Sequence, residues 1–120
     1  MLLTSLGEAV SVEQERRRAP RYSFVATAEL IETASEVRIA SRVSELSLHG
    51  CYLDMINPFP VGTKVLVKIS AGEVLFQAPA TVVFSKTNLG AGLKFDALDK
   101  AHESILERWL EDAHQNNLQV

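Results

Sequence analysis

The chain has 120 residues, of which 47% are apolar and 22% are charged, and these are ordinary values for one compact globular domain. Its formal net charge of −3 argues against a general binder of DNA or RNA, because binding to phosphate backbones depends on a broad basic surface. The single cysteine, Cys51, excludes an internal disulfide, and no apolar run approaches the roughly 18 residues of a membrane span, so we expect a soluble cytoplasmic domain without membrane insertion.

The chain begins with a segment that shows no regular pattern. Residues 1–15 hold scattered leucines and three glutamates without a sustained hydrophobic period. We expect them to form a flexible arm, and residues 16–115 to form the folded domain. Four of the twelve basic residues stand within six positions at the start of that domain: Arg16, Arg17, Arg18 and Arg21. One arginine cluster in a mildly acidic protein suggests a small anionic partner.

Segments in which apolar and polar residues alternate follow the arginines. A period of two is typical of strands that bury one face, and glycine, proline and polar residues separate the segments. Cys51 has apolar neighbours, which predicts a small buried side chain. The alternation predicts strands at residues 22–31, 37–46, 51–55, 64–70 and 74–84, followed by a hairpin turn at residues 87–90 and a last strand that carries Leu93 and Phe95.

The fifth of these segments has the longest period. Its apolar side chains occupy every even position from Val74 to Phe84. A period of two held this long predicts a strand with one continuous apolar face. Pro79 interrupts it, because proline cannot donate a hydrogen bond to a neighbouring strand. We therefore expect a bulge or a strand edge at Pro79.

The period changes to that of a helix after Phe95. An apolar stripe predicts an amphipathic helix, with Asp96 or Asp99 as the N-cap and Trp109 in the core. About six antiparallel strands tend to close into a barrel, whose open end the helix can cover. The residues of the stripe are Leu98, Ile105, Leu106, Trp109, Leu110 and Ala113, and those expected to point away from it are Glu103, Glu107, Arg108 and Glu111.

Two short motifs carry the chemistry. Arg17 and Arg21 are spaced as Arg-x-x-x-Arg before the first strand, and a guanidinium group can pair with two acceptors of a phosphate or a guanine at once. The turn Glu45–Gly50 follows the second strand. There Ser47 can donate to a phosphate, and Gly50 permits a positive φ or a close approach to a ligand. Each motif alone is more often a solvated charge run or an ordinary turn.

In combination the two motifs resemble the signature elements of the PilZ family, an arginine pair before the first strand and a D/N-x-S-x-x-G turn after the second. The sequence Gly90–Phe95 (GAGLKF) is similar to the family's glycine-x-glycine strand before its terminal helix. This resemblance covers residues 16–113. It implies an all-β fold with a C-terminal helix, a six-stranded antiparallel barrel, that binds cyclic di-GMP, a signal with two guanines and two phosphates.

The resemblance also assigns a ligand site. The arginine roles fall to Arg17 and Arg21, and we add the two neighbouring arginines on charge alone. Where the family has aspartate or asparagine at the first turn position, this chain has Glu45, whose carboxylate lies one methylene further out. The candidate ligand-binding residues are Arg16, Arg17, Arg18, Arg21, Glu45, Ser47 and Gly50.

The sequence gives little support for an enzyme. No G-x-S-x-G elbow surrounds Ser47, and the three histidines show no metal-ligand spacing with one another or with Cys51. We therefore expect neither catalysis, nor a metal, nor a cofactor apart from the ligand. The hypothesis is a cytoplasmic receptor whose arm folds over cyclic di-GMP and signals to an unidentified protein partner. The alternative is a PilZ-like protein-interaction domain that no longer binds nucleotide, and Glu45 is the feature in its favour.

Overall fold

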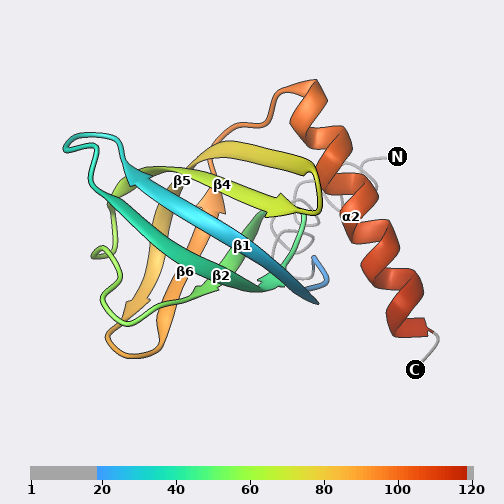
Figure 1. Cartoon of the computed structure of the whole chain (residues 1–120), viewed down its shortest axis with the longest axis horizontal. Helices are drawn as coiled ribbons and strands as arrows, with labels where there is room; N and C mark the ends of the chain where they lie inside the picture. Colours follow the sequence, from blue (N-terminus) through green and yellow to red (C-terminus); the bar gives the residue numbers. More distant parts are fainter. Residues whose placement is uncertain (1–18, 119–120) are drawn as a thin grey trace, which may run out of the picture.

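The computed structural model describes residues 19–118, which form a closed antiparallel barrel and one helix (Figure 1). The strands follow one another around the barrel in the order β1-β2-β3-β6-β5-β4. This confirms the predicted fold class. The elements are β1 (Tyr22–Glu32), β2 (Arg38–Leu46), β3 (Gly50–Asp54), β4 (Lys64–Ala71), β5 (Val74–Lys86), β6 (Gly90–Phe95) and α2 (Lys100–Leu118).

Part of the sequence-based prediction lies outside the described residues. The expected arm, residues 1–15, is among them, as are Arg16, Arg17 and Arg18. The described part of the expected folded domain therefore begins at Ala19.

The core occupies the interior of the barrel, where inward-facing positions of all six strands meet. Leu30, Val43, Leu53, Phe76 and Val82 are completely buried. Alternation with a period of two places these side chains on one face of each strand, and closure of the sheet leaves no unpaired edge. The alternating sequence pattern therefore explains why one face of each strand lies in this core.

Helix α2 packs against β1 and β5, at one end of the barrel (Figure 1). The ring of Trp109 lies 5.1 Å from Phe24 and 6.1 Å from Phe76, measured between ring centroids. Trp109 is 7% exposed, which confirms its predicted place in the core. Leu98 packs on the core from the segment before the helix, so it is not part of the helical stripe.

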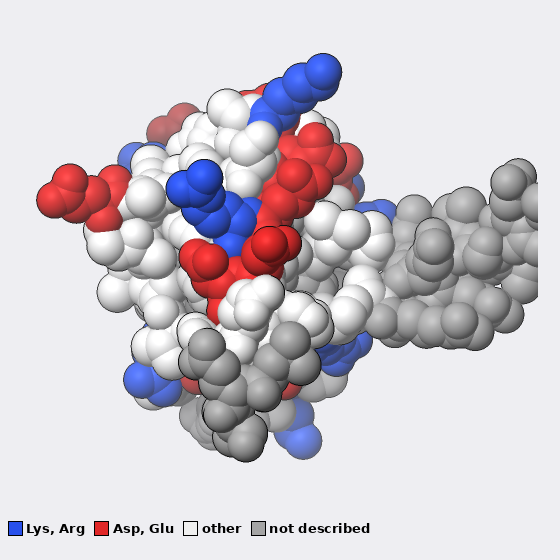
Figure 2. All heavy atoms as spheres, turned by 90° about the vertical axis from the view of Figure 1, so that its right-hand side faces the viewer, with Lys and Arg blue, Asp and Glu red and all other residues white. Residues whose placement is uncertain are grey.

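The opposite face of α2 is exposed, and Figure 2 looks onto it. Glu103, Glu107 and Glu111 lie there at intervals of four, together with Arg108, as the period predicted. Acidic side chains accordingly gather along this face (Figure 2). No helix among residues 19–118 is both long and apolar enough to cross a membrane.

Asp99 is the N-cap of α2. Its carboxylate accepts a hydrogen bond from the backbone N–H of His102 at 2.8 Å, and its side chain also contacts the His102 ring at 3.0 Å. These hydrogen bonds to the charged form lower the pKa of Asp99 below its ordinary value, with the backbone bond as the largest cause. A carboxylate whose pKa is lower in the folded state stabilises the protein above the unfolded pKa.

We expect Asp99→Ala to lower the melting temperature at neutral pH, because the first turn of α2 loses its cap. The difference from the wild type should shrink as the pH falls from about 4, the ordinary pKa of an aspartate, through the lower pKa that Asp99 has in the folded protein. Thermal unfolding followed by circular dichroism at several pH values measures this. Asp112→Ala, an exposed change in the same helix, is the control. A difference that stays constant down to pH 2 would contradict the assignment.

Pro79 lies in a regular part of the β4–β5 ladder, opposite Leu66, and no bulge occurs there. Its carbonyl accepts a hydrogen bond from the backbone N–H of Asp96 at 2.8 Å. The Pro79 nitrogen lies on the same side of β5 as this carbonyl and so faces Asp96, the first residue after the end of β6 at Phe95. The missing N–H therefore falls at a local edge, which is one of the two predicted alternatives.

Three bulges interrupt the ladders, between Ser23 and Ala26 in β1, between Val43 and Glu45 in β2, and between Val82 and Phe84 in β5. A bulge inserts one extra residue and so changes the face on which the following side chains lie. After the bulge in β5, Phe84 is 43% exposed, whereas Val82 is buried. The apolar face expected to continue to Phe84 therefore ends at Val82.

Candidate ligand-binding site

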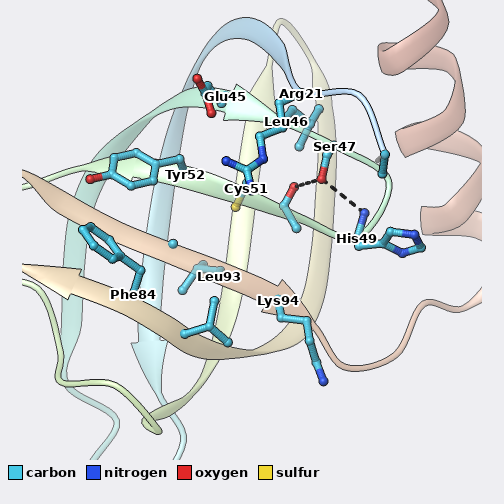
Figure 3. Close-up of a pocket in the computed structure, with 14 residues that line it drawn as sticks. Arg21, Glu45, Leu46, Ser47, His49, Cys51, Tyr52, Phe84, Leu93 and Lys94 are labelled. Atoms are coloured by element: carbon cyan, nitrogen blue, oxygen red, sulfur yellow. Dashed lines mark hydrogen bonds between the residues drawn. The ribbon is translucent and has the colours of Figure 1, made fainter. Parts of the chain in front are cut away.

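A cavity of about 540 Å³ lies on the outer side of the barrel, where the end of β2 meets β3, β6 and β5 (Figure 3). Its volume falls within the range of about 300 to 1,000 Å³ that is usual for small-molecule sites. The lining residues come from the segment before β1, from the turn after β2 and from three strands. They are Ala19, Arg21, Glu45, Leu46, Ser47, His49, Gly50, Cys51, Tyr52, Val83, Phe84, Gly92, Leu93 and Lys94.

The cavity brings together four of the predicted site residues: Arg21, Glu45, Ser47 and Gly50. Their meeting follows from the strand register, because Tyr22 pairs with Leu46 and the residue before β1 therefore lies beside Ser47. Figure 3 shows the Arg21 side chain reaching into the cavity. The ion pairs found within residues 19–118 involve other residues, so none of them engages the Arg21 guanidinium.

Ser47 holds the turn together. Its hydroxyl donates to the carbonyl of Gly50 at 3.2 Å and accepts from the backbone N–H of His49 at 3.3 Å, as the dashed lines of Figure 3 mark. The backbone N–H of Ser47 also donates to Gly50, at 2.9 Å. The Ser47 hydroxyl therefore already donates its proton to a backbone carbonyl of the turn, and the residue helps to shape the cavity wall.

Gly50 is required by its neighbour in β6. Its φ is not positive, and a Cβ at this position would overlap the carbonyl oxygen of Leu93, the neighbour of its β6 partner Lys94. The close approach predicted for Gly50 exists, but the structure shows it with the protein's own backbone. This glycine lets β3 and β6 run close together at the floor of the cavity.

Glu45 reaches the outer face through the bulge in β2. Val43 and Leu46 are both buried although they are three residues apart, because the bulge adds one residue between them. Glu45 therefore faces outward, where it pairs with Tyr52 of β3. Glu45 is exposed. Its carboxylate lies at the rim, on the same face of the sheet as the Tyr52 ring (Figure 3).

The sequence analysis did not identify two aromatic residues that line the cavity on the side opposite Arg21. Tyr52 and Phe84 line the cavity from β3 and β5. Their adjacency depends on strand pairing and on a bulge, and no local motif marks either residue. Cys51 lies beneath and is 8% exposed, so the prediction of a small buried side chain is confirmed. Burial raises the pKa of its thiol to about 12, which keeps it neutral and poorly nucleophilic.

The three histidines lie in separate places. His49 is at the cavity rim, with its ring turned away from Tyr52 (Figure 3). His102 contacts the cap of α2, and His114 bonds the hydroxyl of Tyr22 through Nδ1 at 3.1 Å. His102 and His114 therefore bond different local partners, and neither lines the cavity at whose rim His49 lies.

Comparison with known proteins agrees with this architecture. The model of the PilZ domain family matches residues 15–112. Among solved structures, the PilZ domain of YcgR from Escherichia coli with c-di-GMP superposes with a TM-score of 0.67 at 17% identity, over 87% of this chain and 95% of that one. The PilZ domain of CeSA from a cellulose-synthesising bacterium gives 0.64 at 14% identity, over 75% and 93%.

A tetrameric PilZ-domain protein from Xanthomonas campestris, described as self-assembled through a helical bundle, is also similar. It gives a TM-score of 0.54 at 26% identity and is matched over 54% of its length by 70% of this chain. No curated protein matches the chain. Identities this low establish a shared fold, so a ligand has to be argued from the residues of the cavity.

Proposed function

We propose that this chain, which belongs to the PilZ domain family of cyclic di-GMP receptors, is itself a non-catalytic receptor for that dinucleotide. One observation carries the proposal. Segments far apart in the sequence, the approach to β1 and the turn after β2, deliver their motif residues to a single cavity of suitable size. Of the arginine pair, Arg21 lies in that cavity.

The chemistry of the cavity suits the ligand. Cyclic di-GMP offers two phosphates and two guanines, and the guanidinium of Arg21 can pair with either. The Glu45 carboxylate can accept from the N–H donors of a guanine edge. The buried apolar side chains Leu46, Cys51 and Leu93 exclude water from the floor. Charge-assisted hydrogen bonds over such a floor are stronger than those in open solvent.

A route from the site to α2 is also present. Arg21 is followed by Tyr22, whose hydroxyl bonds His114, and Phe24 stacks near Trp109. A ligand that fixes Arg21 therefore restrains the strand that carries both helix contacts. We include in the proposal that the residues before Tyr22 change conformation on binding, and that the altered surface is recognised by a protein partner.

The alternative function is a protein-interaction domain that keeps the barrel and binds no nucleotide. Two observations favour it: Glu45 replaces the family's aspartate or asparagine, and the Ser47 hydroxyl is already bonded within its turn. In that case no nucleotide would occupy the cavity, and the turn residues would only stabilise the fold.

Isothermal titration calorimetry with cyclic di-GMP at moderate salt separates the two functions. A folded sample that gives saturable heat at micromolar concentrations supports the receptor. Cyclic di-AMP in parallel tests whether guanine is required. The absence of heat, with a circular dichroism spectrum of a folded barrel, would reject the receptor and favour the interaction domain.

The departure at Glu45 leads to a graded prediction. Glu45→Ala should weaken binding, because the guanine donors lose their acceptor. Glu45→Asp should bind as well as the wild type or somewhat better, because the carboxylate returns to the family's position. Both affinities are measured by calorimetry in one buffer. If the bulge has adjusted to the longer side chain, aspartate will instead lose about 1 to 3 kcal/mol. Alanine binding as tightly as glutamate would remove Glu45 from the site.

A further inference from the structure

We propose that one face of helix α2 binds the arginine segment of this chain, residues 16–18, when no ligand is present, and that cyclic di-GMP competes for these arginines. The docking involves only groups of this chain. The competition rests on the proposed function, because it regulates how the motif residue Arg17 reaches the cavity. Residues 16–18 lie outside the described residues, but their charge and their distance along the chain from Tyr22 follow from the sequence.

The face in question carries three glutamates, Glu103, Glu107 and Glu111, and is called the acidic face below. They follow one another at intervals of four residues, so they are neighbours along one side of the helix, and all three are exposed. Figure 2 shows acidic side chains gathered there. Like charges at this spacing repel each other, so a cationic partner would stabilise the face.

No cation in the described part of the chain neutralises the acidic face. The four ion pairs found there include none of its glutamates, and Arg108 of the same helix is also absent from them. From Lys100 to Leu118 the helix has four acidic and two basic residues, a net charge of −2. An open hollow of about 340 Å³ lies on this side of α2, with Glu107 and Glu111 among its lining residues. The acidic face is therefore accessible to a cationic segment.

The arginine segment joins the barrel beside this face. The hydroxyl of Tyr22, the first residue of β1, bonds Nδ1 of His114 at 3.1 Å. His114 stands three residues after Glu111 and so lies on the same side of the helix. Arg21, the residue before Tyr22, reaches into the cavity (Figure 3). The chain therefore enters β1 between the cavity and the end of the acidic face.

The distances allow the contact. Arg18 precedes Tyr22 by four residues, which span up to roughly 13 Å when extended. Along the helix axis, Glu111 and Glu107 lie about 4.5 and 10.5 Å from His114. Residues 16–18 can therefore reach both glutamates without any movement of the barrel.

The charge of the segment matches that of the acidic face. Glu13 and Glu15 offset two of the four arginines between positions 16 and 21, which leaves residues 13–21 with a net charge of +2. A guanidinium group pairs with a carboxylate through two parallel hydrogen bonds. Arg16 and Arg18 have no place in the arginine motif, so the acidic face gives these two residues a partner.

Competition follows from the shared chemistry of the two partners. The phosphates of cyclic di-GMP and the carboxylates of the acidic face are both anions that bind guanidinium groups. An arginine segment held on α2 is less available to the cavity, so docking lowers the apparent affinity for the ligand. Ligand binding in turn releases the acidic face, which becomes a surface that a partner can recognise.

NMR spectra of the free protein test the docking without any ligand. Arg16→Gln/Arg18→Gln should shift the backbone amide signals of Glu107 and Glu111. Raising the salt to about 1 M, where the Debye length is about 3 Å, should move the wild-type signals in the same direction. Arg38→Gln/Arg42→Gln is the matched control, since it changes the net charge equally at arginines that pair with Glu29 and Asp54. It should leave the α2 signals in place.

Calorimetry tests the competition. Glu107→Gln/Glu111→Gln should bind cyclic di-GMP about threefold more tightly than the wild type at low salt, because two exposed ion pairs no longer oppose binding. Glu36→Gln/Glu73→Gln is the control: both glutamates are exposed, neither lines the cavity, and the change of net charge is the same. It should bind as the wild type does.

The outcomes separate this inference from the proposed function. Unchanged Glu107 and Glu111 signals in Arg16→Gln/Arg18→Gln overturn the docking, whether or not the protein binds a ligand. Equal affinities of the wild type and Glu107→Gln/Glu111→Gln overturn the competition. A wild type that binds no cyclic di-GMP rejects the receptor and the competition, while the free-protein spectra still decide the docking. Shifted α2 signals and tighter binding, with both controls unchanged, support the proposal.

Discussion

Replacement of Arg21 by alanine is expected to weaken the binding of cyclic di-GMP by roughly tenfold to a hundredfold, the loss of a charge-assisted contact worth about 1.5 to 3 kcal/mol. Arg21 is exposed, and its side chain reaches into the cavity from the segment before β1 (Figure 3). Because it contributes little to the core, the unfolding transition should stay where it is. Calorimetric titration and a denaturation curve on the same sample measure both effects.

Arg38→Ala is the matched control for this change. Arg38 is also an exposed arginine, but it pairs with Glu29 at 3.3 Å and does not line the cavity. It should bind the ligand as the wild type does. Arg17→Ala, the other member of the predicted pair, should resemble Arg21→Ala. Unchanged affinity in both Arg17→Ala and Arg21→Ala would remove the arginines from the site.

Replacement of Gly50 by alanine is expected to have the largest effect on stability, about 3 kcal/mol or more. The added Cβ would overlap the carbonyl oxygen of Leu93, which is backbone and cannot rotate away. Relief requires β3 and β6 to separate, which disturbs the ladder between them. Equilibrium unfolding in urea measures the loss.

Gly92→Ala is the matched control for Gly50→Ala. Gly92 lies in the same sheet, but its Cβ would meet the side chain of Phe84 at 3.3 Å, and that side chain is partly exposed. That atom is the Phe84 Cβ, so β5 must move by a few tenths of an ångström. This is much less than the overlap at Gly50 requires, and the stability should therefore change much less. Equal stability losses in the two variants would contradict a special requirement at Gly50.

This prediction bears on how binding data for the turn are interpreted. A Gly50 variant that loses ligand binding does not by itself show that Gly50 touches the ligand, because the floor of the cavity is disturbed as well. The same holds for Ser47, whose hydroxyl bonds within the turn. Arg21 and Glu45 are better probes of contact, since both are exposed at the rim.

The sequence by itself determined the strands and the barrel. Burial of one face of a strand imposes a period of two, and that period is visible in the residues of β1, β4 and β5. The helix was equally clear, because its apolar stripe has a different period and contains the buried Trp109. The motif residues Glu45, Ser47 and Gly50 were visible for a local reason, since they belong to one turn.

Only the tertiary structure decided which residues complete the cavity and why they are there. A bulge moves every later side chain of its strand to the other face and leaves no trace in composition, so the outward turn of Phe84 was hidden. Tyr52 and Phe84 meet across Gly92 because of pairings between distant strands. The need for glycine at position 50 likewise comes from the Leu93 carbonyl on another strand, a contact that exists only once the barrel has closed.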